Sequence, residues 1–170
     1  DKVQALAAMG ITASPEDLLT TDGWAAAEDG DESAKAVQRV NQQIALLLQT
    51  ASTLTEDGSN ADVSLLVAET VAEQISSAAV ANGTLDLTAP VFVESLLLEC
   101  LTVAPPDEAV DANTLASVAA SVANVNAVIA DPNLDPVSDT ALAAVLAAQE
   151  ALQDNVAAVV AGTVSIEDFE

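Results

Sequence analysis

Residues 32–54 read ESAKAVQRVNQQIALLLQTASTL, and this stretch decides the fold class. Its apolar side chains recur at steps of three and four residues, the spacing that gathers them on one face of an α-helix. The inward positions are Val37, Val40, Ile44, Leu47, Leu48 and Ala51. Lys35 and Arg39, two of the three basic residues of the chain, fall outside this set and are expected on the outer face.

The same helical period continues through the rest of the chain, interrupted by turn formers. It predicts further long helices over 61–81, 89–103, 108–130 and 137–161, and short ones over 1–9, 15–20 and 24–27. Thr88 is expected to cap the helix that begins at 89, and no run alternates with period two for long enough to form a sheet. We therefore expect an all-α fold. Residues 1–170 would form a single domain, a compact antiparallel bundle of about five long helices plus two or three short ones.

Three segments allow more detailed expectations. Segment 89–103 is apolar nearly all round, so it is expected at the centre of the bundle. Segment 137–161 presents one apolar stripe, which consists of Leu142, Val145, Leu146, Leu152, Val156, Val159 and Val160. Segment 1–9 is already in helical register from its first residues, and we interpret the chain as a fragment excised from a larger protein.

The charge balance restricts the partners. Three basic residues face 27 acidic ones, which gives a formal net charge of −24 at pH 7. A field of that sign repels the phosphates of nucleic acids and anionic lipid surfaces, and it tolerates high salt, which screens the self-repulsion. No stretch has 18 uninterrupted apolar residues, so we expect no membrane insertion. The expected partners are neighbouring domains of the same chain and an unidentified surface or protein partner.

The sequence lacks the usual catalytic side chains. It contains no His, no Tyr and one Cys, so neither a Ser–His–Asp nor a Cys–His arrangement can form within it. Zinc would lack its common ligands, and there is no P-loop or glycine-rich dinucleotide turn. Cys100 lies in an apolar run and is expected to be buried and inert. We therefore predict that the protein is not an enzyme and holds no catalytic cofactor.

Calcium is the one cofactor that the composition leaves open, because Ca²⁺ takes six to eight oxygen ligands from flexible loops. The weak candidate ligands are Asp29, Asp31, Glu32, Asp57 and Asp62, with the 29–32 loop first; residues 131–139 also offer oxygens. The spacing departs from the EF-hand pattern, since Ala34 stands where glycine is required. Helix caps and turns explain the same carboxylates without a metal.

Three amides fall on stripes that are expected to face inward: Asn41, Asn126 and Gln149. A buried amide without partners costs about 1–3 kcal/mol. We therefore expect at least two of the three to be mostly buried and hydrogen-bonded, where they would fix helix register. A buried small-ligand site is the alternative interpretation of the same residues.

Several segments resemble a helical module of very large acidic bacterial surface and exported proteins of the calcium-rich adhesin and cadherin-like type. They are AMGI (8–11), PEDLL (15–19), DGWAA (22–26), AVQRVNQQI (36–44), NGTLDLT (82–88), AAQ (147–149) and VAGTVSIEDF (160–169). The resemblance implies a spacer, cap or display domain between repeat units, in a salt-exposed setting. It defines no catalytic or binding residue.

Three functional interpretations follow. The leading one is a non-catalytic structural or adhesion-associated module of a large secreted or cell-surface bacterial protein. The second is a helical module that binds a small ligand or Ca²⁺ through the amides or the acidic loops. The third is a cytoplasmic helical protein of a halophile, with its acidity as salt adaptation.

Overall fold

The computed structural model describes residues 2–12, 14–20, 22–55, 61–106 and 109–161, and within these ranges it contains eight α-helices and no strand. The all-α prediction is confirmed. The helices are α1 (Lys2–Ala8), α2 (Pro15–Thr20), α3 (Gly23–Glu28), α4 (Glu32–Leu54), α5 (Ala61–Ala81), α6 (Pro90–Val103), α7 (Ala112–Ala130) and α8 (Asp139–Val160).

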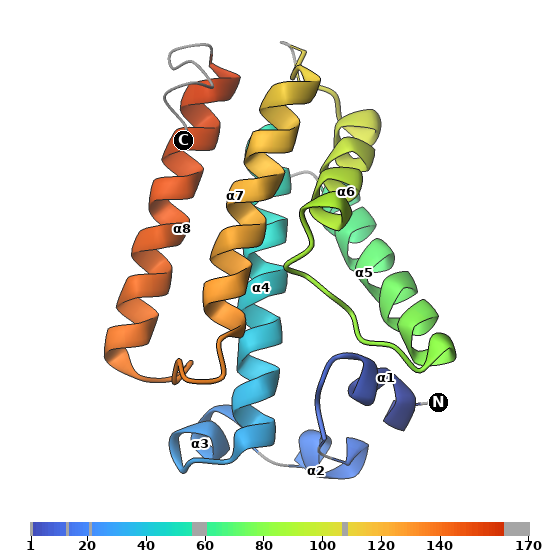
Figure 1. Cartoon of the computed structure of the whole chain (residues 1–170), viewed down its shortest axis with the longest axis vertical. Coiled ribbons are helices and arrows are strands. Elements are labelled where there is room, and N and C mark those ends of the chain that lie inside the picture. The colour runs from blue at the N-terminus through green and yellow to red at the C-terminus, as the bar shows by residue number, and fades with distance from the viewer. Residues whose placement is uncertain (1, 13, 21, 56–60, 107–108, 162–170) are drawn as a thin grey trace.

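The five long helices run alternately up and down, so that consecutive ones are antiparallel (Figure 1). Helix α4 lies in the middle and contacts α3, α5, α6, α7 and α8. Helix α1 packs on α5 near the lower end of the bundle, and α3 packs on α4. Short polar connections between the helices favour this arrangement of antiparallel neighbours.

Local signals in the sequence set the helix ends. Gly10, with φ of +73°, and Gly30, with φ of +92°, take the left-handed conformation that ends a helix in the Schellman manner. After α1, for example, the N–H of Ile11 donates to Leu6 O at 2.8 Å and the N–H of Gly10 donates to Ala7 O at 3.0 Å. Helix α5 ends in the same way with Asn82 in the left-handed position, at φ of +52°.

Carboxylates cap the other ends of three helices. Asp22 accepts from the N–H groups of the first turn of α3, Asp31 from that of α4, and Asp111 from that of α7. At α7 the Thr114 hydroxyl donates to Asp111 Oδ2 at 2.6 Å. This hydroxyl, together with backbone N–H groups, lowers the pKa of the Asp111 carboxyl below its usual value. Such caps typically stabilise a helix by about 1 kcal/mol each.

The core consists of small aliphatic side chains at the centre of the bundle. Its fully buried members include Leu46, Leu47, Ala51, Leu54, Val63, Val67, Val93, Leu96, Leu97, Val118, Val122, Ile129 and Val156. With almost no aromatic rings, the helices approach closely, and each buried Val or Leu stabilises the fold by about 1.5–3 kcal/mol relative to exposure.

Helix α6 is not at the centre, so the expectation for segment 89–103 is wrong. Val91 is 79% exposed and Leu98 is 56% exposed on its outer face, while Val93, Leu96, Leu97 and Cys100 face α7, α5 and α4. Figure 1 places α6 at the side of the bundle. It is the shortest of the five long helices, and Pro90 at its start and Pro105 after its end limit how far it can pack.

Three smaller expectations also differ from the structure. Thr88 does not cap α6; its N–H and hydroxyl donate to Asp86 Oδ1 in the preceding turn, and Ala89 occupies the cap position. Helix α7 begins at Ala112, after its Asp111 cap, instead of at residue 108. On α8, Leu146 is 55% exposed, because the buried stripe passes through Ala141, Val145, Gln149, Leu152 and Val156.

Candidate functional site

One face of α4 holds the connection between α7 and α8 in place. Arg39 Nη2 donates to Leu134 O at 2.9 Å and to Pro132 O at 3.2 Å, and Gln42 Nε2 donates to Pro136 O at 3.0 Å. Lys35 Nζ lies 3.5 Å from Asp135 Oδ2 and 3.7 Å from Glu32 Oε1. We call these three side chains, Lys35, Arg39 and Gln42, the loop clamp.

The loop clamp corrects the expectation that Lys35 and Arg39 lie on an outer face in water. The side chain of Lys35 is only 16% exposed. Residues 35, 39 and 42 are spaced by four and three positions, so they share one side of a helix. That spacing was a signal for a polar interface, although the sequence does not reveal which segment would occupy it.

The clamped loop also has internal order. Asp131 Oδ1 accepts from the backbone N–H of Asn133 at 2.8 Å and from its side-chain amide at 2.9 Å. Asp135 Oδ1 accepts from Val137 N at 3.3 Å. The acidic residues of segment 131–139 therefore shape a turn whose carbonyls meet the donors of α4.

Buried amides occur in the core, but they differ partly from the predicted set. Asn126 is fully buried, and its Nδ2 donates to Leu87 O at 2.8 Å. Gln149 is buried at 8% exposure. Asn41 is exposed, so the expectation for that residue is wrong. Gln43 is the buried amide of α4 instead, and its Nε2 donates to the backbone carbonyl of Asn126 at 3.0 Å.

The side-chain amides of Gln43 and Asn126 donate to backbone carbonyls, at Asn126 O and Leu87 O, and not to each other's side chains. Through Leu87, Asn126 ties α7 to the link between α5 and α6, and Gln149 is the buried amide of α8. The helical pattern predicts an inward position for Asn41 because its neighbours in that pattern are apolar. The polar side of α4 is broader than that pattern suggested, since it turns Gln42 and Gln43 toward other segments.

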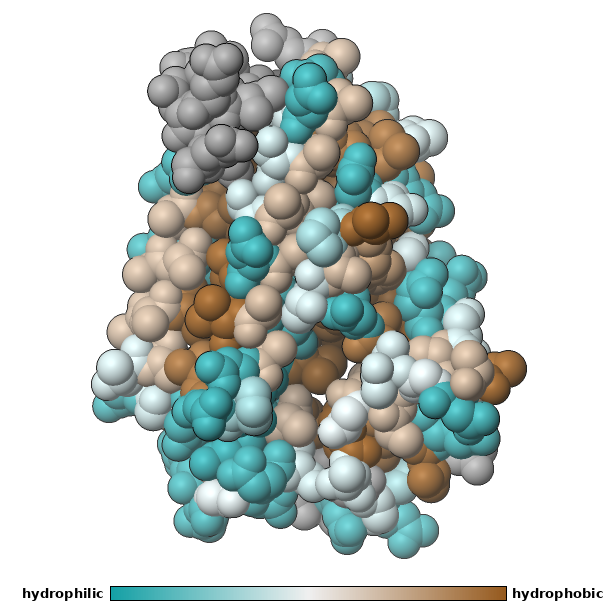
Figure 2. All heavy atoms as spheres, viewed as in Figure 1, coloured by the Kyte–Doolittle hydropathy of each residue, from teal (hydrophilic) through white to brown (hydrophobic). Residues whose placement is uncertain are grey.

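A cavity of about 320 Å³ lies between the N-terminal half of α4, the end of α1, the 83–89 link and the end of α7. Figure 2 shows a hollow with apolar atoms behind it in the lower middle of the displayed face. Arg39, Gln43 and Asp86 are its polar lining residues with charged or amide groups, and Met9, Val40 and Leu87 are among its apolar ones. Of these polar side chains, Gln43 is buried, Arg39 is half-buried and Asp86 is exposed.

Two buried polar atoms near this cavity lack partners among the described residues. Arg39 Nε, on a lining residue, has no acceptor within hydrogen-bonding distance, and Asn126 Oδ1 has no donor. Asn126 lies behind the lining, where its Nδ2 donates to Leu87 O and its backbone carbonyl accepts from Gln43 Nε2. A third such atom, Gln42 Oε1, belongs to the loop clamp. Buried polar atoms without partners are rare and usually meet water or a ligand.

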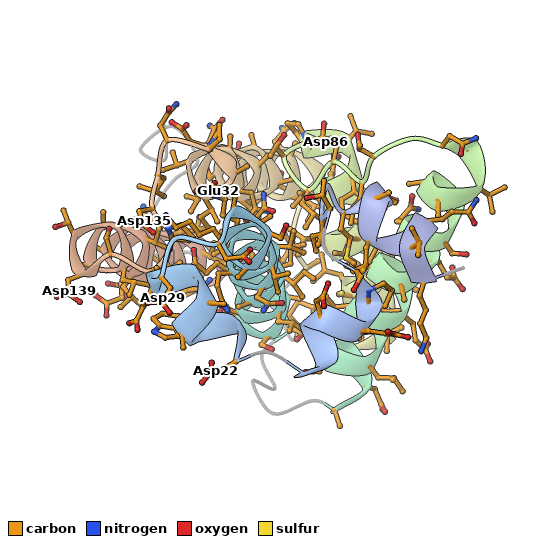
Figure 3. The ribbon with its side chains drawn as sticks, turned by 90° about the horizontal axis from the view of Figure 1, so that it is seen from below. Asp22, Asp29, Glu32, Asp86, Asp135 and Asp139 are labelled. Atoms are coloured by element: carbon orange, nitrogen blue, oxygen red, sulfur yellow. The ribbon has the colours of Figure 1, made fainter. Side chains whose placement is uncertain are left out.

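The calcium candidates do not converge. Asp29 ends α3, Asp31 caps α4 through Ala34 N at 2.9 Å, and Glu32 reaches Lys35. Asp62 is exposed in the first turn of α5, and Asp57 lies outside the described residues. Figure 3, which views the bundle from below, shows the labelled carboxylates spread around its lower end. In the described ranges, no three His, Cys, Asp or Glu side chains gather as metal ligands.

Cys100 faces the core of the bundle from α6 and is fully buried. Burial raises the pKa of its thiol to about 11, and the charge of Glu99 adds to the effect. The reactive thiolate is therefore scarce at neutral pH.

Comparison of the chain with protein-family models, with curated proteins and with solved structures found no match. Among the described residues, α5 and α7 are long and apolar enough to cross a membrane by length and composition alone. Core helices of bundles meet the same criterion, so the two helices do not settle the relation of the chain to a membrane.

Proposed function

We propose that the chain is a non-catalytic structural module of a large secreted or cell-surface protein. The loop clamp is the observation that carries this proposal. Two of only three basic residues in the sequence hold one loop against the central helix. The polar chemistry of this segment serves cohesion between helices.

The acidic residues support the same proposal. Asp22, Asp31 and Asp111 complete helix ends, and Asp131 and Asp135 shape the clamped loop. Carboxylates used in this way stay on the surface, where a strong negative field opposes non-specific association and salt screens its cost. Neighbouring domains of the same chain, and not nucleic acid or membrane interiors, are the partners that fit such a surface.

Antibody labelling of the source cells tests the location. An antibody raised against residues 1–170 should label intact cells or the culture medium, and sequencing across the flanking reading frame should find further domains. A cytosolic marker, detected only after lysis, is the control. Labelling that also requires lysis, together with a short cytosolic reading frame, would support the salt-adapted cytoplasmic alternative and overturn the proposal.

Thermal melting separates the structural role from calcium binding. At equal ionic strength, NaCl, MgCl₂ and CaCl₂ should raise the melting temperature by similar amounts, because all three screen the same self-repulsion. The Asp29→Asn variant serves as a probe of the 29–32 loop, since Asp29 makes its cap contacts through the backbone. A rise specific to CaCl₂ that Asp29→Asn removes would favour the ion-binding alternative.

A further inference from the structure

We propose that the cavity between α1, α4, the 83–89 link and α7 binds a small zwitterion of the α-amino-acid class. Such a molecule carries a carboxylate, an ammonium group and a small aliphatic part. The cavity offers a complementary group for each of them. Binding at this position would bridge four segments and add a ligand-dependent stabilisation to the structural role.

Arg39 supplies the site for the carboxylate. Its Nη2 is committed to the two loop carbonyls, which fixes the guanidinium in place. Its Nε is buried and has no acceptor among the described residues, although Arg39 lines the cavity. A guanidinium held in place through Nη2, with an Nε–H that has no acceptor among the described residues, is a pre-organised donor. Charge-assisted bonds of this kind are stronger than neutral ones.

Asp86 and the end of α7 supply the site for the ammonium group. Asp86 lines the cavity from the link, and both bonds that its side chain accepts from Thr88 go to Oδ1. Its carboxylate supplies a negative charge beside the cavity. Figure 3 shows Asp86 on the other side of α4 from Asp29 and Asp139, so it is separate from the rest of the labelled acids. Ala130, the last residue of α7, also lines the cavity, and the C-terminal end of a helix favours positive charge.

The volume of the cavity and the net charge of the chain restrict the chemical class of the ligand further. A volume of about 320 Å³ is at the lower end of the range for small-molecule sites, and the apolar lining from Met9, Val40 and Leu87 suits a short aliphatic group. The net charge of −24 disfavours a simple anion at this position. The single arginine in turn disfavours a simple cation beside it. A molecule with both charges and no net charge avoids both penalties.

The test follows the Nε–Hε signal of Arg39 by NMR in the ¹⁵N-labelled chain. Arg39 is the one arginine in the sequence, so this signal needs no assignment. L-Alanine is the probe, and propionate and ethylamine, which each lack one of its charged groups, are the matched controls. We expect a saturable shift of the signal with L-alanine. Propionate and ethylamine should each bind at least about tenfold more weakly in the same titration. The melting temperature should rise with L-alanine over the same concentration range.

Two variants locate the response while leaving Arg39 intact. Asp86→Asn keeps an oxygen for the Thr88 turn but removes the charge, and it should weaken the L-alanine response about tenfold. Ala36→Leu fills part of the cavity from α4 and should abolish the response, whereas Ala45→Leu, at an exposed position of the same helix, should not change it.

Three results would overturn the proposal. A propionate response equal to that of L-alanine would make the cavity a plain anion site. No saturable shift with any of the three probes would mean that the cavity takes water alone. An unchanged L-alanine response in folded Ala36→Leu would place the binding elsewhere on the molecule.

Discussion

Helices α4 and α6 contradict what their compositions suggest. Helix α6 is the more apolar of the two, yet it lies at the side of the bundle with Val91 and Leu98 in solvent. Helix α4 carries Lys35, Arg39 and several amides, yet it contacts five other helices and buries Leu46, Leu47 and Leu54 completely. The depth of a helix in this fold therefore depends on how many neighbours its faces can satisfy, not on its mean hydropathy.

The difference in depth between α4 and α6 has a physical reason. A helix at the centre of a bundle meets neighbours on several sides, and those neighbours include loops with free carbonyls as well as apolar faces. Helix α4 meets both kinds of partner, because leucines line one side and the loop clamp lines another. Helix α6 carries no Lys, Arg, Asn or Gln that could reach such a loop, and the hydroxyl of its Thr102 donates to Leu98 O within the helix.

The largest expected effect comes from truncating one leucine in each helix. Leu47→Ala in α4 should lower the free energy of unfolding by about 2–5 kcal/mol, because the side chain is fully buried and leaves a cavity. Leu98→Ala in α6 should change it by less than about 0.5 kcal/mol, because that side chain is 56% exposed. Urea denaturation of both variants measures the difference. Equal losses would show that α6 is packed as deeply as α4.

The loop clamp should give the next largest effect. Arg39→Met keeps the apolar stem but removes the donors to Pro132 and Leu134, and it should cost about 2 kcal/mol. Lys2→Met removes the same charge from an exposed position and is the control. In hydrogen exchange, the amides of residues 133–139 should lose protection in the first variant only. Unchanged protection there would mean that the loop does not depend on α4.

A smaller effect is expected from the buried amide of α4. Gln43→Ala removes the bond to Asn126 O and should cost about 1 kcal/mol. Asn41→Ala, two residues earlier and exposed, should be neutral or slightly stabilising, because alanine is the better helix former. Denaturant midpoints report both. A larger loss of stability for Asn41→Ala than for Gln43→Ala would mean that Asn41, and not Gln43, faces the core.

The inner face of α6 can be tested by an effect on stability that is absent at neutral pH and appears only at alkaline pH. Burial raises the pKa of Cys100 from 9.0 to about 11, so the folded state holds this proton more tightly than the unfolded state. The resulting stabilisation is complete below pH 9 and is lost as the pH rises through about 11. The sequence contains no tyrosine to mask it.

Denaturation between pH 8 and 11 measures this contribution. The free energy of unfolding should fall more steeply with pH in the wild type than in Cys100→Ala, which has no thiol to titrate. Parallel slopes would show that Cys100 reaches solvent. That result would remove the contrast between the buried and exposed faces of α6.

The helices themselves could be predicted because their signals are local. The ranges 32–54 and 61–81 were predicted as the structure has them, since periodic apolar residues fill each segment and Gly, Asn and Asp mark the ends. The error for Leu146 is a phase error within a correctly predicted helix. Alanine-rich α8 has few large residues to fix which side faces the core.

The site was less predictable, because its partners are distant in the sequence. Arg39 meets carbonyls 93 and 95 residues away, and Gln43 meets one 83 residues away. A helical pattern shows that these side chains share a face, but it does not show which loop comes to that face. The cavity has the same origin, since it forms only where α1, the link and α7 meet α4.

Native-state hydrogen exchange tests the central role of α4 most directly. The amides of residues 43–51 in α4 should be the most protected in the chain and exchange only by global unfolding, whereas those on the outer side of α6, around Val91 and Leu98, should exchange faster through smaller openings. The opposite ranking, with α6 the last helix to exchange and α4 opening before it, would contradict the account.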